Sequence, residues 1–453
     1  MNCRVRFAPS PTGFMHIGNA RIAVVNYLFA RQNNGELIFR IDDTDRERSK
    51  KEYEDSIIND LSWLQITYAK VLRQSARTSR YDDIKGNLMS RGTLYRCYES
   101  QEELECKRRM ATLKGAPPAY DRAALQLSDS QIAKLEESGR TPYLRFKLPN
   151  EVVTWDDVIL GRITYDLSNI SDPVICKADG AYLYSFSSVI DDIDCGITHI
   201  IRGQDHVTNT AVQIAMFNEI SGGAYSCDFA HLSLLTNKDG SQFSKRVGGM
   251  NLGDFRSAGI DPMAISSILA TLGTSLDTKP FLDMNELIRY FDITKFGSNS
   301  PKFDSRDVWK LNKKIMQLKR YADVKDYISS ESVFEIAKDN IETYNDLRMW
   351  DQIFTNSYNP SYAPSESEAA VLNAALGVLR SCDSNITWPE FWKTVAEKAN
   401  ASGRNLYVPL RMATTGMDHG PNLTDLFATL GAENVRIRVG AALDLFLSQQ
   451  KQK

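Results

Sequence analysis

The 453-residue sequence lacks an apolar run near the roughly 20 residues that a membrane-spanning helix needs. Its seven cysteines are an odd number, and none is spaced as Cys-x-x-Cys, so a disulfide scaffold is not favoured. A formal net charge of −3 excludes a uniformly basic nucleic-acid-binding coat but still allows a local basic face. The first residues, Met-Asn-Cys-Arg-Val-Arg-Phe, also lack the charged-then-apolar plan of a signal peptide. We therefore expect a cytoplasmic protein with reduced thiols and no membrane partner.

The N-terminal part alternates between strand and helix patterns. Strands are predicted at 3–8 and 36–42, and apolar residues at helical spacing predict a helix over 19–32. A second helix follows, with an apolar stripe that begins at Tyr53. Strand, turn, helix, strand, helix is the start of a parallel α/β sheet.

The pattern then changes and later resumes. Polar helical stretches at 100–114 and 128–138 and β-rich sequence from 143 to 160 indicate an insertion between two halves of one sheet. The α/β pattern returns with a strand at 197–202 and a helix at 208–220. Beyond about 234 the chain is mainly helical, and the Pro- and Ser-containing segment 357–367 is a linker candidate.

The first motif with chemical content lies between the first strand and the first helix. Residues 9–19 read Pro-Ser-Pro-Thr-Gly-Phe-Met-His-Ile-Gly-Asn. Gly13 and Gly18 allow a close approach of the backbone, and the helix that starts near Gly18 directs its free N–H groups toward an anion. His16 adds a hydrogen-bond donor for a phosphate oxygen. The alternative is a plain strand-to-helix turn with a capping histidine.

The second motif is a polar loop that contains two adjacent cations. Residues 239–246 read Asp-Gly-Ser-Gln-Phe-Ser-Lys-Arg, and two glycines follow at 248 and 249. Lys245 and Arg246 are suited to stabilise charge that develops on a transferring phosphate. Taken alone, such a pair is more often a solvated charged loop. The two motifs in this order make the phosphate interpretation much stronger.

With these motifs on both sides of an α/β core, the chain resembles a class I aminoacyl-tRNA synthetase, specifically a bacterial-type glutamyl-tRNA synthetase. Arg-Phe-Ala-Pro-Ser-Pro-Thr-Gly at 6–13 with His16-Ile17-Gly18 resembles the first ATP motif of that family, and 243–246 resembles the second. Further matching runs lie at 197–206, 229–232 and 404–420.

The resemblance implies ATP, with Mg²⁺ on the nucleotide, and glutamate and tRNA as substrates, joined through a glutamyl-adenylate. It makes His16 and Lys245 the catalytic residues, with Lys245 stabilising the transition state. The ATP-binding residues that it implies are His16, Gly18, Asp205, Ser244, Lys245 and Arg246. No enzyme nucleophile is needed, because the substrate carboxylate attacks phosphorus.

By the same resemblance, glutamate is bound by Arg6, Ser10, Asp42, Tyr184, Ser188 and Arg202. A guanidinium fork suits a carboxylate better than an ammonium does. Within this set, Asp42 replaces the usual glutamate, and Ser188 stands where some members have asparagine. In the ATP-binding segments, Gln204 replaces a frequent glutamate and Gln242 replaces the first lysine of the second motif.

The implied fold is a Rossmann-like α/β catalytic domain, split by an α+β insertion and followed by an all-α anticodon-binding region. We expect the catalytic domain at 1–81 and 185–233, the insertion for the tRNA acceptor stem at 82–184, and a helical bridge at 234–320. The anticodon-binding domain is expected at 321–453. Lysines and arginines outnumber acids over 302–320, which predicts an amphipathic basic helix that contacts RNA.

Two further expectations concern metal and oligomeric state. Some relatives bind zinc in the insertion, but here Cys97 has no second soft ligand at suitable spacing, and Cys106 is badly placed. We therefore predict no structural zinc. The relatives are usually monomers, and we expect the same here.

Three alternatives stay open at this stage. One is a glutaminyl-tRNA synthetase, against which Ser10 and the helical C-terminal half argue. Another is a paralogue that charges tRNA(Gln) with glutamate. The third is a catalytically weak tRNA-binding paralogue, which only Gln204 and Gln242 support.

Overall fold

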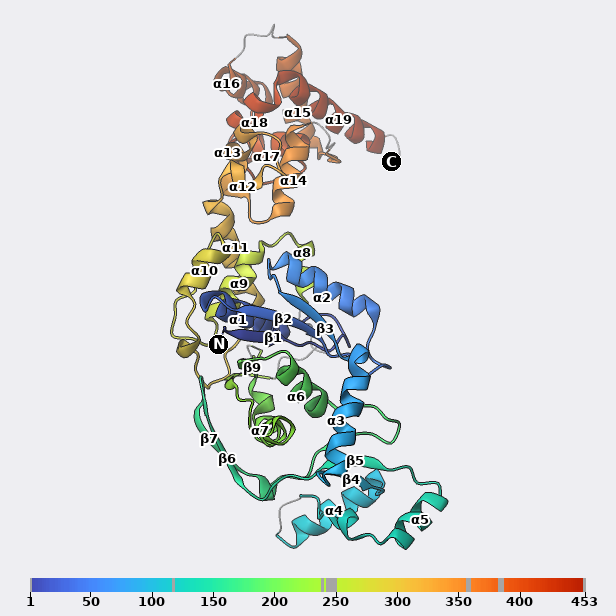
Figure 1. The fold of residues 1–453 in the computed structure, drawn as a ribbon. Coiled ribbons are helices and arrows are strands. Elements are labelled where there is room, and N and C mark those ends of the chain that lie inside the picture. The colour runs from blue at the N-terminus through green and yellow to red at the C-terminus, as the bar shows by residue number, and fades with distance from the viewer. Residues whose placement is uncertain are drawn as a thin grey trace. The chain divides into compact units, whose positions relative to one another are not determined.

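The computed structural model describes residues 2–115, 119–237, 240–241, 251–355, 360–381 and 387–450. The chain divides into two compact units. The first comprises Met1–Ser257 and Pro262–Val308, and the second comprises Ala258–Asp261 and Trp309–Lys453. Figure 1 draws the first unit mainly in blue, green and yellow, and the second mainly in orange and red.

The N-terminal strands form a parallel sheet in the order β1–β2–β3. These strands are β1 (Arg4–Phe7), β2 (Glu36–Ile41) and β3 (Lys70–Arg73). The connecting helices are α1 (Ile17–Gln32) and α2 (Lys51–Trp63). The predicted strands at 3–8 and 36–42 and the helix at 19–32 are confirmed within one or two residues. Gly35 lets the chain turn back closely, since a Cβ at this position would lie 2.2 Å from the Cys3 carbonyl oxygen.

A second sheet has the strand order β7–β6–β10–β9. Its strands are β6 (Val152–Asp157), β7 (Gly161–Asp166), β9 (His199–Gly203) and β10 (Asp228–Leu232). β9 and β10 are parallel, and β6 joins β10 in parallel at Asp157 and Phe229. The two sheets meet at β1 and β9, where the Thr198 amide donates to the Arg4 carbonyl at 2.8 Å. The β-rich stretch therefore extends past its predicted end at 160, because the β6–β7 hairpin completes this sheet.

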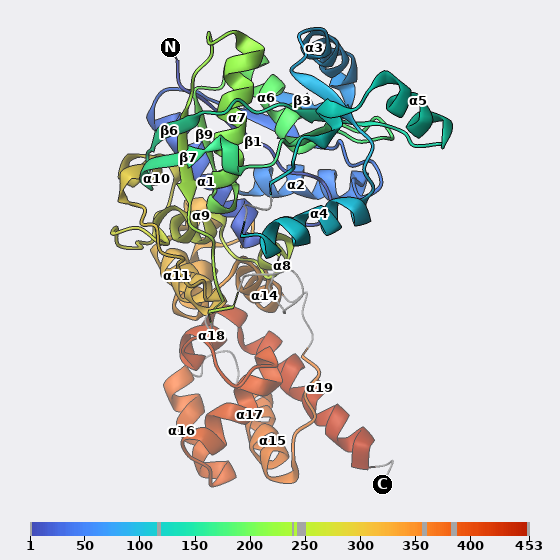
Figure 2. The same cartoon turned by 90° about the horizontal axis from the view of Figure 1, so that it is seen from below.

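Helices cover both faces of these strands. α1 packs against β1, β2 and β9, while α6 (Tyr184–Asp194) and α7 (Val207–Ser221) lie on the opposite side (Figures 1 and 2). The helix predicted at 208–220 is α7. A buried cluster that includes Phe186, Met216 and Phe229 packs α6 and α7 onto the sheet.

Among its described residues, the rest of the segment 82–184 contains a three-stranded antiparallel sheet and three α-helices. The strands are β4 (Leu94–Cys97), β5 (Tyr143–Phe146) and β8 (Val174–Cys176), and the helices are α3 (Thr78–Ser90), α4 (Gln101–Leu113) and α5 (Asp129–Glu137). Ser100 and Ser128 begin α4 and α5 with capping boxes. The two helices predicted at 100–114 and 128–138 are thus confirmed.

Beyond β10 the described chain is helical. The helices are α8 (Leu252–Ser257), α9 (Pro262–Thr271), α10 (Met284–Tyr290) and α11 (Ser305–Leu318), followed by α12 (Tyr321–Val324), α13 (Glu331–Ala337), α14 (Tyr344–Phe354), α15 (Glu366–Ser381), α16 (Trp388–Ala399), α17 (Arg404–Thr415), α18 (Leu423–Leu430) and α19 (Ala432–Gln450). The core of the second unit includes Trp350, Phe391 and Phe427. The predicted α/β class with an all-helical C-terminal part is confirmed. None of the described helices has the length and apolar character to cross a membrane.

Candidate active site

Four strands end at one edge of the joined sheets and bring polar side chains together. Arg6 lies on β1, Asp42 directly follows β2, Arg202 lies on β9 and His231 lies on β10. In parallel sheets this carboxyl edge is where ligands bind. Three of the predicted glutamate-binding residues, Arg6, Asp42 and Arg202, therefore lie at this edge, on or next to three different strands.

A buried ion cluster surrounds Arg40. Its Nε and Nη2 donate to the two oxygens of Asp42 at 2.6 and 3.0 Å, and its Nη1 donates to Asp192 at 2.7 Å. Arg6 donates through Nε to the same Asp192 at 3.3 Å. All four side chains are at most 5% exposed. Such charges are tolerated inside a protein only when they are paired with good geometry.

Asp191, the neighbour of Asp192 on α6, supports this cluster from behind. Its carboxylate accepts hydrogen bonds from Gln74 at 2.8 Å, Arg77 at 2.6 Å and the Tyr81 hydroxyl at 3.0 Å. Burial raises the pKa of Asp191, and the cations Arg40 and Arg77 act against that rise. The hydrogen bonds fix α6, and with it the residues that α6 presents to the site.

Arg202 differs from Arg40 in its partners. It is 5% exposed, and it donates to the Tyr184 hydroxyl at 3.1 Å, to Thr210 Oγ1 at 2.6 Å and to His231 Nε2 at 3.4 Å. In the described part of the chain it forms no ion pair with a carboxylate. Burial lowers its pKa, so the folded protein disfavours its charge. At the carboxyl edge of these strands, a buried guanidinium without a carboxylate partner among the described residues is suited to receive an anionic ligand.

Tyr184 and Ser188 lie one turn apart on α6. The Tyr184 hydroxyl accepts from Arg202, whereas Ser188 is fully buried and its hydroxyl accepts from Arg40 Nη2 at 2.9 Å. In this structure Ser188 therefore orients the ion cluster. Its assignment to glutamate stays a prediction.

The first motif forms the turn from β1 into α1. His16 is the N-cap of α1, and its imidazole accepts from the Asn19 amide at 3.2 Å. Gly18 has to be small, because a Cβ there would lie 2.9 Å from the His16 ring. A cavity of about 250 Å³ opens beside this turn; its lining includes Ser10, Gly13 and Asn19. The motif thus combines the capping role with a cavity at a helix N-terminus.

Most of the second motif lies outside the described residues, including Gln242, Ser244, Lys245 and Arg246. The segments on either side of it are anchored to α1 and the turn before it. Upstream, Arg21 Nη1 donates to the Ser233 carbonyl at 2.6 Å, and downstream the Leu252 amide donates to the Met15 carbonyl at 3.3 Å. The chain is therefore held to α1 at Ser233, before the motif, and to the turn before α1 at Leu252, after it.

Asp205 lies just beyond β9, in the short 3₁₀ helix Gln204–His206. Its side chain is 55% exposed and faces the backbone of Gly203, where a Cβ would lie 2.4 Å from Asp205 Oδ1. The His206 ring lies 5.3 Å from the Tyr184 ring. Burial and then Arg202 lower the pKa of His206 to about 4, so this imidazole is neutral at physiological pH.

Sequence reasoning assigned no role to Arg40, Asp192 and His231, which the structure places at the centre of the site. A charged residue within an apolar strand was a usable signal for Arg40, and an Asp-Asp pair inside an apolar helix pattern was one for Asp192. His231 lies in a run that matches the family, but its partners come from other strands.

The basic segment around α11 is confirmed as an amphipathic helix, with Lys310, Lys313 and Lys314 exposed. The prediction of RNA contact is wrong for Lys319 in this segment, and Arg438 near the C-terminus is likewise buried. Lys319 is 9% exposed and pairs with Asp261 at 2.7 Å. Arg438 is 4% exposed and donates to the Thr414 and Ile353 carbonyls. Both satisfy buried acceptors inside the second unit.

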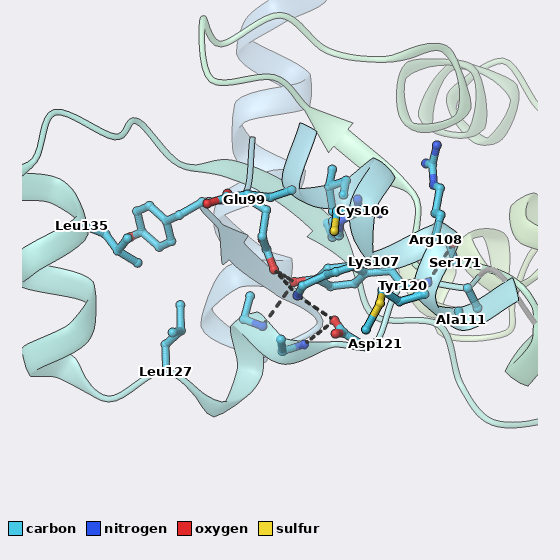
Figure 3. A pocket seen from close by; sticks show the side chains of 18 of the residues that line it. Glu99, Cys106, Lys107, Arg108, Ala111, Tyr120, Asp121, Leu127, Leu135 and Ser171 are labelled. Atoms are coloured by element: carbon cyan, nitrogen blue, oxygen red, sulfur yellow. Dashed lines mark hydrogen bonds and ion pairs between the residues drawn. The ribbon is translucent and has the colours of Figure 1, made fainter. Parts of the chain in front are cut away.

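A large cavity of about 810 Å³ lies in the segment 82–184 and contains no motif residue (Figure 3). Glu99 accepts there from Lys107 at 3.1 Å and from the Tyr120 hydroxyl at 2.7 Å. Cys106 lines it, while Cys97 is buried and donates to the Tyr120 hydroxyl at 3.8 Å. The two cysteines are thus held in different surroundings.

Comparison with known families decides the identity of this arrangement. The catalytic domain described as "tRNA synthetases class I (E and Q)" matches residues 2–310, and an anticodon-binding domain matches residues 307–443. The chain belongs to the class I tRNA synthetases (E and Q). The family resemblance inferred from the two motifs is therefore confirmed, and membership of the class implies that this synthetase uses ATP.

Individual relatives agree over nearly the full length of this synthetase. It is 42% identical to glutamate--tRNA ligase 1 of Cereibacter sphaeroides over 95% of this chain and 98% of the relative. It is 43% identical to glutamate--tRNA ligase 2 of a Ruegeria species over 96% and 99% of the two chains. The crystal structure of a glutamate tRNA ligase from Elizabethkingia meningosepticum in complex with its amino acid has a TM-score of 0.76 at 26% identity, and covers 98% and 100%.

Proposed function

We propose that the protein ligates L-glutamate to tRNA(Glu) in an ATP-dependent reaction that passes through glutamyl-adenylate and releases AMP and diphosphate. Relatives at 42–43% identity over almost the whole chain carry this activity in their names. The observation that carries the proposal is Arg202, a buried cation without a carboxylate partner among the described residues, at the same sheet edge as Arg6 and Asp42. Its charge needs an anionic ligand, and glutamate supplies two carboxylates.

The chemistry requires positioning and charge stabilisation more than a reactive side chain. An oxygen of the glutamate α-carboxylate attacks the α-phosphorus of ATP, and diphosphate leaves. A hydroxyl of the terminal ribose of tRNA then attacks the carbonyl carbon, and AMP leaves. Holding both reactants in line accounts for much of the rate in such reactions.

We assign the glutamate carboxylates to Arg6 and Arg202, with Ser10, Asp42, Tyr184 and Ser188 around the rest of the substrate. The fixed guanidinium of Arg202, held by three hydrogen bonds, supports this assignment. Asp42 lies at the same edge, and its charge suits the substrate ammonium. Both of its oxygens accept from Arg40, which orients the carboxylate.

We assign the phosphates of Mg²⁺-bound ATP to His16 and Gly18, at the N-terminus of α1, and the ribose or adenine to Asp205. Ser244, Lys245 and Arg246 complete the phosphate site in this proposal. The two flanking hydrogen bonds to Ser233 and Met15 support it, because they hold the ends of that segment near α1.

For tRNA we propose the acceptor-stem role for 82–184, the bridge for 234–320 and anticodon binding for 321–453, within a catalytic domain at 1–81 and 185–233. The match of an anticodon-binding domain to residues 307–443 supports the last of these. We further propose that the protein acts as a monomer in the cytoplasm.

ATP–diphosphate exchange tests the proposed function. Exchange should depend on L-glutamate, and it should require tRNA, as is general in the family. Aminoacylation of separately purified tRNA(Glu) and tRNA(Gln) then identifies the acceptor. Charging of tRNA(Gln) alone would favour the paralogue that charges tRNA(Gln) with glutamate. Binding of tRNA without exchange would favour the catalytically weak tRNA-binding paralogue.

Lys245→Ala should lower kcat for aminoacylation by about 10²–10³-fold, because one preorganised cation no longer meets the developing phosphate charge. The dissociation constant for tRNA should not change. Steady-state aminoacylation and filter binding measure the two quantities. A fall of less than threefold in kcat would remove Lys245 from the proposed site, and Lys279→Ala serves as the control for loss of an exposed lysine elsewhere.

Charge on the exposed face of α11 should make tRNA binding sensitive to salt. Lys313→Gln combined with Lys314→Gln should reduce the slope of log K against log salt by about 2, since each phosphate contact contributes close to one unit. Binding titrations from low to moderate salt measure the slope. An unchanged slope would show that this face does not contact RNA, with Lys279→Gln as the control.

A further inference from the structure

A chain of three buried side chains leads from the segment 82–184 into the substrate site. Asp157 at the end of β6 contacts His231 on β10, with 2.5 Å between Oδ2 and Nδ1. His231 Nε2 then faces Arg202 Nε on β9 at 3.4 Å. Asp157 and His231 are at most 4% exposed. The pairing of β6 with β10 at Asp157 and Phe229 is what places the carboxylate beside the imidazole.

Asp157 on one side of His231 and Arg202 on the other determine which ring nitrogen carries the proton. An ionised carboxylate only accepts hydrogen bonds, so Nδ1 has to carry the proton toward Asp157. Nε2 is then an acceptor, and it faces two donors: Arg202 Nε and the hydroxyl of Thr210 at 2.9 Å. Thr210 in turn accepts from Arg202 Nη2 at 2.6 Å. In that arrangement both imidazole nitrogens have partners, and the Thr210 hydroxyl, which also lies 3.2 Å from the His206 carbonyl, can donate to either acceptor.

The surroundings keep His231 neutral. The charged and titratable groups that face it are Asp157 from β6, Arg202 from β9, Arg6 from β1 and His206 beyond β9. Burial lowers the pKa of His231, and the two arginines lower it further, while Asp157 acts in the opposite direction. A proton on Nε2 would direct N–H at N–H and cation at cation.

We propose that Asp157 and His231 are positioning residues for glutamate binding: the carboxylate sets the Nδ1–H tautomer, and the imidazole then holds the Arg202 guanidinium in register with the substrate carboxylate. Neither residue touches the substrate in this proposal. The assignment rests on the proposed function, because it takes Arg202 as the carboxylate receptor. It also gives the β6–β7 hairpin a direct connection to the active site.

A single amide substitution should reverse the tautomer. Asp157 Oδ1 accepts from three backbone amides, those of Ile159 at 3.1 Å, Leu160 at 3.0 Å and His231 at 3.2 Å. In Asp157→Asn the amide oxygen has to take this position, so the NH₂ group points at His231 Nδ1. Nδ1 then accepts, the proton moves to Nε2, and Arg202 meets a donor in place of an acceptor.

The kinetic test uses the full-length protein and two substrates. Asp157→Asn should raise KM for glutamate about 10- to 100-fold, as expected for a displaced binding group, with KM for ATP within twofold. Asp156→Asn, on the exposed side of the same strand, is the matched control and should change neither. His231→Asn keeps a donor for Asp157 but leaves Arg202 Nε without its acceptor, and should reproduce the glutamate effect. Equal rises in both KM values, or none, would overturn the proposal.

Imidazole ¹⁵N NMR of histidine-labelled protein tests the tautomer without any activity. The chain has five histidines, and the signal lost in His231→Asn identifies the relevant one. We expect Nδ1–H in the unmodified protein and Nε2–H in Asp157→Asn, and any other result overturns the relay. If the unmodified protein does not activate glutamate, the proposed function fails; if it does and the NMR tautomer is Nε2–H, only the relay fails.

Discussion

Arg202→Met should lower kcat/KM for glutamate activation on the order of 10³-fold, and the variant should be at least as stable to heat as the unmodified protein. The activity is lost because the substrate carboxylate enters a buried site that no longer holds a cation. A loss of this size matches truncating one member of a desolvated charge pair.

The stability part of this prediction follows from the partners of Arg202. Among the described residues, the hydrogen-bond partners of the guanidinium are neutral, namely Tyr184, Thr210 and His231. Burial lowers its pKa, which means that the folded state carries the charge at a cost. A methionine of similar volume removes that cost. We therefore expect Arg202 to contribute to substrate binding and not to the stability of the fold.

Two measurements on one preparation test this prediction. ATP–diphosphate exchange at varied glutamate gives kcat/KM, and thermal unfolding gives the midpoint. Arg162→Met, an exposed arginine on β7, is the control and should change neither quantity. A midpoint several degrees lower, or exchange within tenfold of normal, would show that Arg202 is not an unpaired substrate receptor.

Arg40→Met, unlike Arg202→Met, should destabilise the protein. We expect it to lower the free energy of unfolding by about 3–5 kcal/mol. Arg40 pairs with Asp42 at 2.6 Å and with Asp192 at 2.7 Å, and it lies 3.9 Å from Asp191. All three carboxylates are buried; Asp42 would lose the cation that binds both of its oxygens, whereas Asp191 would keep Arg77 and Asp192 would keep Arg6. Since natural domains have only about 5–15 kcal/mol in total, this one change should leave the protein close to unfolding at 37 °C.

The loss of unfolding free energy in Arg40→Met should depend on pH. Burial already raises the pKa of Asp42 to about 6, and Arg40 is the group that lowers it, so removing Arg40 raises this pKa further. A carboxyl whose pKa is raised in the folded state stabilises folding at low pH and destabilises it as pH rises. The deficit of Arg40→Met should therefore be larger at pH 8 than at pH 5.5.

Urea unfolding at these two pH values measures the effect. Arg48→Met removes an exposed pair with Asp45 and should cost at most about 1 kcal/mol at either pH. A deficit for Arg40→Met as small as that of Arg48→Met, or one that grows toward pH 5.5, would contradict the role assigned to the ion cluster.

Local patterns in the sequence predicted the local structure well. The turn from β1 through His16 and Gly18 into α1, the helices α4 and α5, and the amphipathic α11 all lie where the local residue patterns indicated. Each depends on residues within a few positions of one another, and short-range sterics and hydrogen bonds are enough to specify them.

Local patterns could not predict which distant segments pair with one another. Arg40 and Asp192 are 152 positions apart, and His231 and Asp157 are 74 apart. The sequence treated Lys319 as one of several basic residues, whereas the fold buries it against Asp261. In the same way, the β6–β7 hairpin reads as part of an insertion but completes the sheet with β10.

By itself, then, the sequence determined the family, the order of α/β and helical parts, and the residue types at the two phosphate motifs. Only the tertiary structure decided which buried arginine has an internal carboxylate and which one lacks it. Arg6, Arg40 and Arg202 look alike as residues on apolar strands. Their roles differ because the energy of a buried charge depends on what lies within a few ångströms, and that is set by the packing of strands far apart in the chain.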